Sequence, residues 1–545
     1  MRTRCRFRWM AFAAVLAMLG AACGEGAPDA GARQAAAARV GVEPVPVVHL
    51  FENHSSSLVA WRRADVRDRV VVHLDGHPDL DWLPPETVAR IAAASPDELR
   101  TLELHPYALD GDTLRRFAIW NFVYPAARLG IVRRMVWVVP DGTLHDPWEA
   151  WRLTREILTD KLDGVGLDEA SGFRLQGRAI EGEVLGVPLT IVELRDLPAI
   201  EETVLLDIDL DYFTTRSAVS QEVVEVPWIG PEEVVAGLRA KGIRTDLATI
   251  SYSTLGGFLP PENRWIGKAL LGRLRDPATA VIAREALHRE AVEAWSDGRQ
   301  TDAVAALERA SRSDPDDACS WYCLSKAYAA TNRPVDAAAA RQRAIELDPV
   351  LAHAALLDGD RAWLNGNWEH ALTRYRGYLE ELPVGPFTAY ALRREAGSLM
   401  RLRRDDEAIA VFEKVLELAP SSADTLLDLG VLYRERGELD RAIDAFERAH
   451  RTIPDRSTYA QALGTTYLLA GRYEEGIAAL EQAVAGKPTS VTARVNLASG
   501  LLAAGRPRDA AGHLRVALSL EPKHPRAREL AVRVAGQGVG LTEPP

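Results

Sequence analysis

The chain has 545 residues, of which 47% are hydrophobic and 26% are charged, and its formal net charge at pH 7 is -12. This length exceeds what one hydrophobic core usually supports, so we expect at least two domains, and the composition excludes a disordered or fibrous protein. The acidic balance argues against a general nucleic-acid surface, so we expect no nucleic-acid partner.

Residues 1–23 are typical of an export signal. Four arginines precede the apolar run Trp9–Leu19, and the small residues Gly20-Ala21-Ala22 lead to Cys23. The run is too short for an ordinary membrane span, and no later segment has about 18 unbroken apolar residues. The stretch Leu19–Cys23 resembles a bacterial lipoprotein signal, in which the cysteine is acylated; ordinary cleavage nearby is the alternative. The resemblance implies a protein exported from the bacterial cytoplasm, periplasmic or at the cell surface, that meets the membrane only through a lipid anchor.

Residues 24–44 are rich in alanine and glycine and predict a flexible linker. Over residues 45–278, short apolar runs alternate with amphipathic stretches, which is typical of an α/β domain with an open, mainly parallel sheet. The predicted strands are Val47–Leu50, Val70–Leu74, Met135–Val139, Leu189–Val192, Val204–Ile208 and Leu247–Ser251.

Three of these strands end beside residues of the types that serve as metal ligands. The first is followed by Phe51-Glu52-Asn53-His54 and the second by Asp75-Gly76-His77-Pro78-Asp79, and the fifth ends within the stretch Asp207-Ile208-Asp209-Leu210-Asp211. Parallel strands present ligands at their carboxyl ends, and several facing carboxylates repel one another unless a cation lies between them. Mixed carboxylate and imidazole donors suit manganese, iron or zinc. Each motif alone is more often a surface ion pair.

Together, the three motifs resemble the arginase and deacetylase superfamily, and most closely the subgroup that includes peptide arginases, over about residues 45–275. The resemblance implies two divalent metal ions, manganese or else iron or zinc, with Asp75 and Asp207 bridging both. Asp211 stands one residue earlier than the third aspartate of ureohydrolases, and no glutamate matches the one that holds their guanidinium substrate. The metal ligands implied by the resemblance are His54, Asp75, His77, Asp79, Asp207 and Asp209.

This resemblance implies a binuclear metallohydrolase of C–N bonds that acts on the guanidinium group of arginine, either free or within a peptide or protein. A zinc-type deacetylase is an alternative. We expect Asp209 to stabilise the reaction intermediate and accept its proton, and Asp211 to support the ligands or bind substrate. His145 and His105 are loop candidates for proton transfer, whereas His49 and His73 are expected to face away from the ligands or to sit inside strands, and so to be structural.

From Arg284 the sequence repeats with a helical period. Prolines recur every 34 residues, with one three-residue insertion after the third, and small residues stand 24 and 12 positions before each proline. This period resembles the tetratricopeptide repeat and predicts an all-α solenoid of seven repeats over residues 284–535, followed by a disordered tail at 536–545. Cys319 and Cys323 lie four apart on a predicted helix without a companion metal motif, so we expect two buried small side chains.

The sequence also allows a second class of function, that of a binding protein. Solenoids present long concave surfaces to a peptide or protein partner, so the chain is alternatively a non-catalytic binding scaffold whose metal site is structural. The two hypotheses are compatible if the repeats recruit a polypeptide that the metal site modifies.

Overall fold

The computed structural model describes residues 44–105, 107–109, 115–146, 150, 153, 163–219, 222–276 and 283–540. The predicted export signal with Cys23, the linker up to residue 43 and the last five residues lie outside these ranges. Among the described residues, no helix combines the length and the apolar character needed to cross a membrane.

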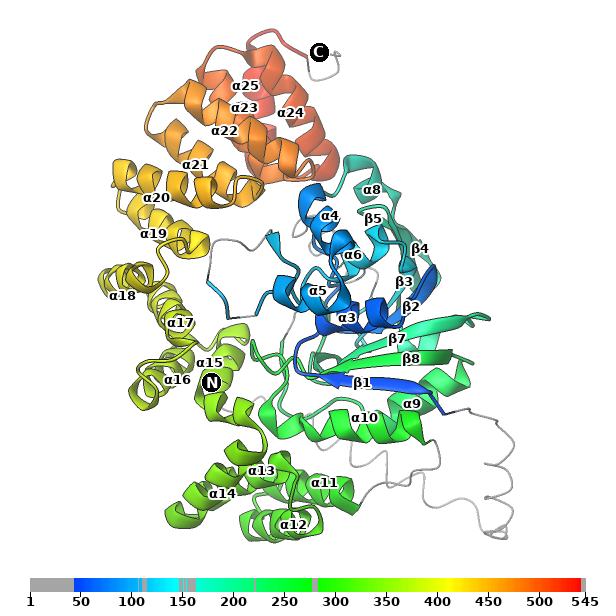
Figure 1. The fold of residues 1–545 in the computed structure, drawn as a ribbon. Helices are drawn as coiled ribbons and strands as arrows, with labels where there is room; N and C mark the ends of the chain where they lie inside the picture. Colours follow the sequence, from blue (N-terminus) through cyan, green and yellow to red (C-terminus); the bar gives the residue numbers. More distant parts are fainter. Residues whose placement is uncertain are drawn as a thin grey trace, which may run out of the picture. The chain divides into compact units, whose positions relative to one another are not determined.

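The first part of the described chain contains one eight-stranded sheet (Figure 1). Its strands are β1 (Val47–Phe51), β2 (Arg69–Leu74), β3 (Val132–Val139), β4 (Arg174–Gln176), β5 (Ala179–Val184), β6 (Val187–Glu193), β7 (Thr203–Asp209) and β8 (Arg244–Ser251). Their order is β1-β8-β7-β2-β3-β6-β5-β4, and all pairs are parallel except β6 with β5 and β5 with β4. The prediction of a mainly parallel sheet is therefore confirmed.

Each face of the sheet is covered by helices and has its own core. Val71, Met135 and Leu205 face one core, and Val70, Val72 and Leu206 face the other. Because both faces are buried, the parallel strands are continuous apolar runs. The first core includes residues of α3 (Ser56–Arg63), α4 (Pro85–Ala93), α5 (Pro96–Leu102) and α6 (Val123–Arg128), and the second includes residues of α9 (Pro231–Ala240) and α10 (Trp265–Arg275).

Four short helices connect these elements. They are α8 (Leu167–Gly172), η3 (Leu194–Asp196), η4 (Leu210–Phe213) and η5 (Pro261–Asn263).

Within residues 283–540, fourteen α-helices form seven consecutive pairs, one further α-helix, α25, follows them, and the short helix η6 (Pro349–His353) lies between the second and third pairs (Figure 1). Each recurring proline lies after the second helix of a pair, as the 34-residue period predicts. The pairs are α11 (Ala283–Ser296) with α12 (Gln300–Ser313), α13 (Ala318–Ala330) with α14 (Pro334–Leu347), α15 (Ala354–Leu364) with α16 (Trp368–Glu381), α17 (Thr388–Arg401) with α18 (Asp405–Leu418), α19 (Ala423–Glu435) with α20 (Leu439–Thr452), α21 (Ser457–Leu469) with α22 (Tyr473–Gly486) and α23 (Val491–Ala503) with α24 (Pro507–Leu520); α25 is Pro525–Gly536.

The recurring small residues lie where the two helices of a pair approach closely. A Cβ atom on Gly430 of α19 would lie 2.5 Å from the ring of Phe446 in α20, and one on Gly464 of α21 would lie 2.9 Å from the carbonyl oxygen of Gly476 in α22. Only small side chains fit at these crossings, which explains the sequence pattern that predicts the array.

The repeats also contact the sheet domain, and the chain from residue 44 onwards forms one compact unit. Arg264, just before α10, donates to Asp348 at 2.7 Å. Asn365, after α15, exchanges two hydrogen bonds with the backbone of Val223, at 3.0 and 2.8 Å.

Gly257, in the loop after β8, lies against the backbone of α15. Its φ is +83°, and a Cβ atom there would lie 2.6 Å from the backbone nitrogen of Arg361. Gly437, in the turn after α19, has a similar φ of +77°, but a Cβ atom there would meet no other atom within 4 Å. The two glycines therefore separate the effect of backbone conformation from the effect of a close contact.

We expect Gly257→Ala to lower the free energy of unfolding by about 2–3 kcal/mol and Gly437→Ala by about 1 kcal/mol, because both force a non-glycine residue into the left-handed region and only the first adds a steric clash. Chemical denaturation of the two variants measures the difference. Equal losses would show that α15 does not pack tightly on this loop.

Candidate functional site

The candidate site lies at the carboxyl ends of four neighbouring strands, β1, β8, β7 and β2. In the parallel register, His73 of β2 stands opposite Asp207 of β7, and Asp207 stands opposite Thr249 of β8. Side chains two residues apart in a strand share a face. Asp75 and Asp209 therefore lie on the same face of the sheet as His73 and Asp207, two residues nearer the carboxyl ends of their strands.

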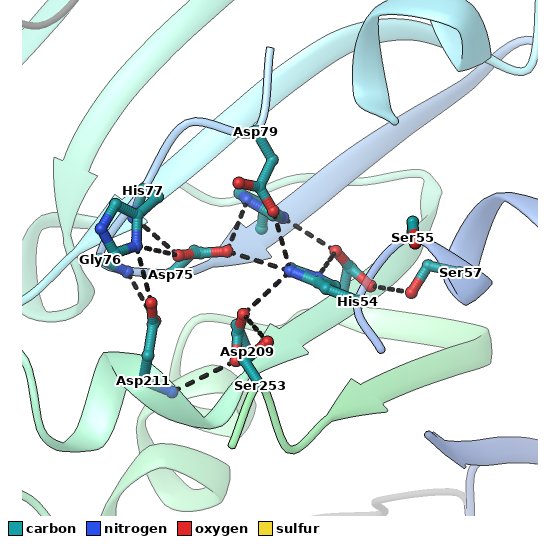
Figure 2. A network of polar contacts seen from close by, with 12 residues as sticks. His54, Ser55, Ser57, Asp75, Gly76, His77, Asp79, Asp209, Asp211 and Ser253 are labelled. Carbon is teal, nitrogen blue, oxygen red and sulfur yellow. Dashed lines mark hydrogen bonds and ion pairs between the residues drawn. The ribbon is translucent and has the colours of Figure 1, made fainter. Parts of the chain in front are cut away.

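His54, in the loop between β1 and α3, lies at the centre of the cluster (Figure 2). It is fully buried. Its Nδ1 atom is 3.3 Å from Asp75 Oδ2, 2.9 Å from Asp79 Oδ2 and 3.0 Å from Asp209 Oδ2. One ring nitrogen carries at most one hydrogen, so it cannot satisfy three carboxylate oxygens.

Asp207 accepts hydrogen bonds on both of its carboxylate oxygens. Its Oδ1 atom accepts from the hydroxyl of Ser57 at 2.9 Å and from that of Thr249. Its Oδ2 atom lies 2.8 Å from His54 Nε2 and 2.8 Å from His73 Nδ1. Asp207 thus holds both imidazole rings in place.

A second group of contacts joins the loop after β2 to the end of β7 (Figure 2). His77 Nδ1 lies 2.7 Å from Asp211 Oδ2 and 3.6 Å from Asp75 Oδ1. The Gly76 amide donates to Asp211 Oδ1 at 3.0 Å. Asp75 therefore lies between His54 on one side and His77 on the other.

The protonation equilibria reflect crowding of buried carboxyl groups. Burial and the neighbouring charge of Asp75 raise the pKa of Asp79 to about 6 and that of Asp211 to about 6. Burial and the charge of Asp211 raise the pKa of Asp209 to about 7. Burial raises the pKa of Asp75 as well, but hydrogen bonds from His54 and His73 outweigh it and hold the value well below its usual range.

The histidines show the opposite balance. Burial lowers the pKa of His54, but the carboxylates of Asp207 and Asp209 outweigh it and hold the value well above its usual range. Burial likewise lowers the pKa of His73, whereas hydrogen bonds to Asp207 and Asp75 raise it to about 10. Positive charge is therefore favoured at the centre of the cluster.

The donor set fits divalent transition ions. Among the described residues, Asp75 Oδ2 is buried in close ion-pair contact with two imidazole nitrogens, 3.3 Å from His54 Nδ1 and 3.2 Å from His73 Nε2. Ligand atoms of His54, Asp75 and Asp209 lie within 4.8 Å of one another, as do those of Asp75, His77 and Asp211. The two groups share Asp75, and their mixture of imidazole and carboxylate suits manganese, iron or zinc.

The cluster opens into a cavity of about 580 Å³ that both parts of the chain line. The sheet domain contributes His77, Asp79, Asp209 and Asp211, among others. The opposite wall comes from the first helices of three repeats: Tyr390, Arg393 and Arg394 of α17, Asp424 and Leu427 of α19, and Arg456, Thr458 and Tyr459 at the start of α21.

The arginines of this wall are held by ion pairs and hydrogen bonds. Arg393 lies 3.1 Å from Asp428, Arg394 donates to the hydroxyl of Tyr390 at 2.7 Å, and Arg456 lies 3.4 Å from Asp81. The repeats therefore add fixed guanidinium groups to the lining of the cavity that the carboxylate cluster also reaches.

The structure brings together all six ligand positions named from the sequence, together with Asp211. It does not bring in His145, which is exposed and bonds to the carbonyl of Gly142. His105 stacks on Phe387 instead, with ring centroids 5.2 Å apart. His73 lies inside β2, which is one of the two alternatives expected for it, and its side chain shares the face of Asp75, two residues further on.

Several contributors to the site were not predicted. The hydroxyl of Ser253 donates to Asp209 Oδ2 at 2.6 Å, and those of Ser57 and Thr249 bind Asp207. Serines and threonines near strand ends are too common to stand out in a sequence. The positive φ of Asp79 (47°) and Ser253 (43°) marks both loops as strained, a feature that only the structure reveals.

Comparisons with known proteins support the repeats. Models described as tetratricopeptide repeat match residues 288–352, 387–455, 427–491 and 467–534. These matches support a tetratricopeptide array and, with it, peptide or protein binding. None of them is to an arginase, a deacetylase or another hydrolase.

Similar solved structures include MamA from Desulfovibrio magneticus RS-1, with 22% identity, coverage of 32% of this chain and 97% of that chain, and a TM-score of 0.29. TTC0263, a thermophilic TPR protein in Thermus thermophilus, has 26% identity, coverage of 34% and 97%, and a TM-score of 0.27. YrrB, described as a TPR protein with an unusual peptide-binding site, has 19% identity, coverage of 34% and 95%, and a TM-score of 0.26. No curated protein sequence matches the chain.

Proposed function

We propose that the chain is a metal-dependent hydrolase of C–N bonds in which the sheet domain holds the metal ions and the repeats complete the substrate cavity. One observation carries this proposal: two groups of imidazole and carboxylate donors, both containing Asp75, lie at the end of a cavity. Export from the bacterial cytoplasm, with an acyl anchor on Cys23, remains part of the proposal.

In this proposal His54, Asp75, Asp79 and Asp209 hold one ion, and Asp75, His77, Asp209 and Asp211 hold the second. The Asp-x-Asp pair of the site is then Asp209 and Asp211, two residues later than the resemblance implied. The reason is that both oxygens of Asp207 already accept hydrogen bonds, whereas Asp209 and Asp211 line the cavity. We assign Asp207 the role of orienting His54 and His73.

Two divalent ions bound here, manganese or else iron or zinc, would lower the pKa of water and polarise a trigonal carbon for attack. The residues around them supply the rest. Asp209, fixed by Ser253, faces both His54 and the cavity and is placed to accept a proton from the reacting group. The rings of Phe258, Trp120 and Tyr390 line the same cavity and limit the access of water.

We propose a guanidinium group as the substrate, with arginine in a peptide preferred. Asp79, Asp81 and Asp211 line the cavity, so its lining is rich in carboxylate oxygens that can accept hydrogen bonds from a guanidinium group. The arginines of the opposite wall face what remains of the substrate and suit the carbonyl or carboxylate groups of a polypeptide.

The second candidate function is a non-catalytic binding scaffold, and the tetratricopeptide matches favour it. In that case the cavity is a peptide-binding site and the metal ions only stabilise the fold. Only the hydrolase converts a substrate, so measured turnover distinguishes the two candidates.

The test is to purify the full chain, remove metal with a chelator and add manganese back. We expect about two ions per chain to rebind and urea to be released from arginine-containing peptides only in the reloaded protein, because the buried carboxylates require a cation. Inductively coupled plasma mass spectrometry and a urea assay measure the two quantities.

Acetyl-lysine peptides tested in parallel identify the alternative reaction. Release of acetate without urea would show that the protein catalyses deacetylation and does not hydrolyse a guanidinium group. If the protein binds metal and peptide but releases neither urea nor acetate, it is a non-catalytic binding scaffold.

A further inference from the structure

A second group of metal-binding side chains lies away from the cavity, where the first two repeats meet. Ligand atoms of His288, Cys319 and Cys323 lie within 4.8 Å of one another. His288 comes from α11, and the two cysteines come from α13. Cys319 and His288 are almost fully buried, with 4% and 3% of their surfaces exposed.

The two cysteines are neighbours simply because residues four apart share a helix face. The position of His288 has no such local explanation. Its ring stacks on Trp265 of α10, with centroids 6.2 Å apart. Its Nε2 atom lies 3.0 Å from the hydroxyl of Ser320, which in turn donates to Asp317 Oδ2 at 2.7 Å. Packing and hydrogen bonds thus hold a buried imidazole beside two sulfur atoms.

The charges around this group also fit a cation. Asp317 is buried, and its carboxylate lies 3.6 Å from His288 Nε2 and 3.4 Å from the ammonium of Lys268. Two thiolates, one neutral imidazole and one divalent ion carry no net charge, so the group can be buried with its metal at little electrostatic cost. Sulfur and imidazole donors together select zinc over manganese.

We propose that His288, Cys319 and Cys323 bind one zinc ion. The site is separate from the candidate active site, because none of these three ligands lines its cavity. Its role is therefore structural: it joins α11 of the first repeat to α13 of the second. The sulfur of Cys319 also lies 3.2 Å from the carbonyl oxygen of Glu262 in η5, so the junction includes the sheet domain.

Two other states of the cysteines are chemically reasonable and are distinguished by experiment. As a thiol, Cys319 would donate its hydrogen to Glu262 and bind no metal. Under oxidising conditions, Cys319 and Cys323 could instead form a disulfide within α13, which would lower the mass of the chain by two hydrogens.

The test uses cobalt(II), because thiolate sulfur bound to cobalt gives a charge-transfer absorption in the near ultraviolet that oxygen and nitrogen ligands do not give. The full chain is expressed in medium containing cobalt and depleted of zinc, so that a buried site is loaded as the protein folds. We expect this absorption in the wild-type protein. Cys323→Ser should lose the absorption and should contain one metal ion fewer per chain than the wild-type protein.

Asp209→Asn is the matched control, because it alters the carboxylate cluster and leaves the sulfur atoms in place. It should keep the thiolate absorption, so failure of the hydrolase proposal and failure of the zinc proposal give different results. A folded, cobalt-grown wild-type protein without thiolate absorption would overturn the zinc site, as would an intact mass that shows a disulfide. Both results come from the unaltered chain and do not depend on whether a variant folds.

Discussion

Asp209→Asn is expected to lower turnover by at least about 1,000-fold and to remove one or both metal ions from the carboxylate cluster. Asp209 lies 3.0 Å from His54 Nδ1 and lines the cavity, so we place it between the ions and the substrate. Asparagine keeps the shape of the side chain but removes the negative charge. A 1,000-fold loss corresponds to about 4 kcal/mol of transition-state stabilisation. Metal content and turnover at saturating manganese measure the effect.

Two further variants act as controls for this prediction. Asp207→Asn should chiefly lower the melting temperature, because Asp207 orients two buried histidines. Ser253→Ala removes one hydrogen bond to the Asp209 carboxylate and should lower turnover only about tenfold, since a hydrogen bond to a charged group contributes about 1.5 kcal/mol. Full metal content and turnover in Asp209→Asn would refute the proposed ligand set.

The parallel part of the sheet could be predicted because burial on both faces leaves uninterrupted apolar runs. All six predicted strands are the parallel strands of the structure. The antiparallel strands β4 and β5 were not predicted. Every residue of β4 is exposed, and β5 buries only Ile180 and Val184, so neither contains an apolar run to recognise.

The location of the candidate site could be predicted, but the depth of each residue within it could not. Asp207, Asp209 and Asp211 follow one another at intervals of two, and the sequence does not distinguish which pair reaches the cavity. The structure distinguishes them by their partners: Asp207 accepts from Ser57, Thr249 and two histidines, whereas Asp209 and Asp211 line the cavity.

The contribution of the repeats to the cavity could not be predicted at all. The 34-residue period reports how each repeat packs on the next, because solenoid contacts are between neighbours. It contains no information about which helices meet the sheet domain. Arg393, Arg394 and Arg456 therefore do not stand out in the sequence and become part of the candidate site only through tertiary contacts.

Asp360 of α15 connects the sheet domain to this wall of the cavity. It is fully buried and accepts hydrogen bonds from three tyrosine hydroxyls: Tyr375 at 2.8 Å, Tyr107 at 2.9 Å and Tyr390 at 3.1 Å. Tyr107 belongs to the sheet domain, and its hydroxyl accepts from the Gly256 amide at 2.9 Å. Arg394 lies 3.6 Å from the same carboxylate.

Asp360→Ala is expected to lower the free energy of unfolding by about 4 kcal/mol, because it leaves three buried hydroxyls and a partly buried guanidinium without their shared acceptor. Tyr375→Phe, the matched control, removes one of these hydrogen bonds and should lower it by about 1 kcal/mol. Denaturant titration measures both. Below the melting temperature, Asp360→Ala should also raise KM for a peptide substrate at unchanged metal content, because Tyr390 and Arg394 line the cavity while the metal ligands lie on the sheet domain. Losses of equal size in the two variants, or an unchanged KM in a folded Asp360→Ala protein, would show that this carboxylate neither holds the junction nor shapes the cavity wall.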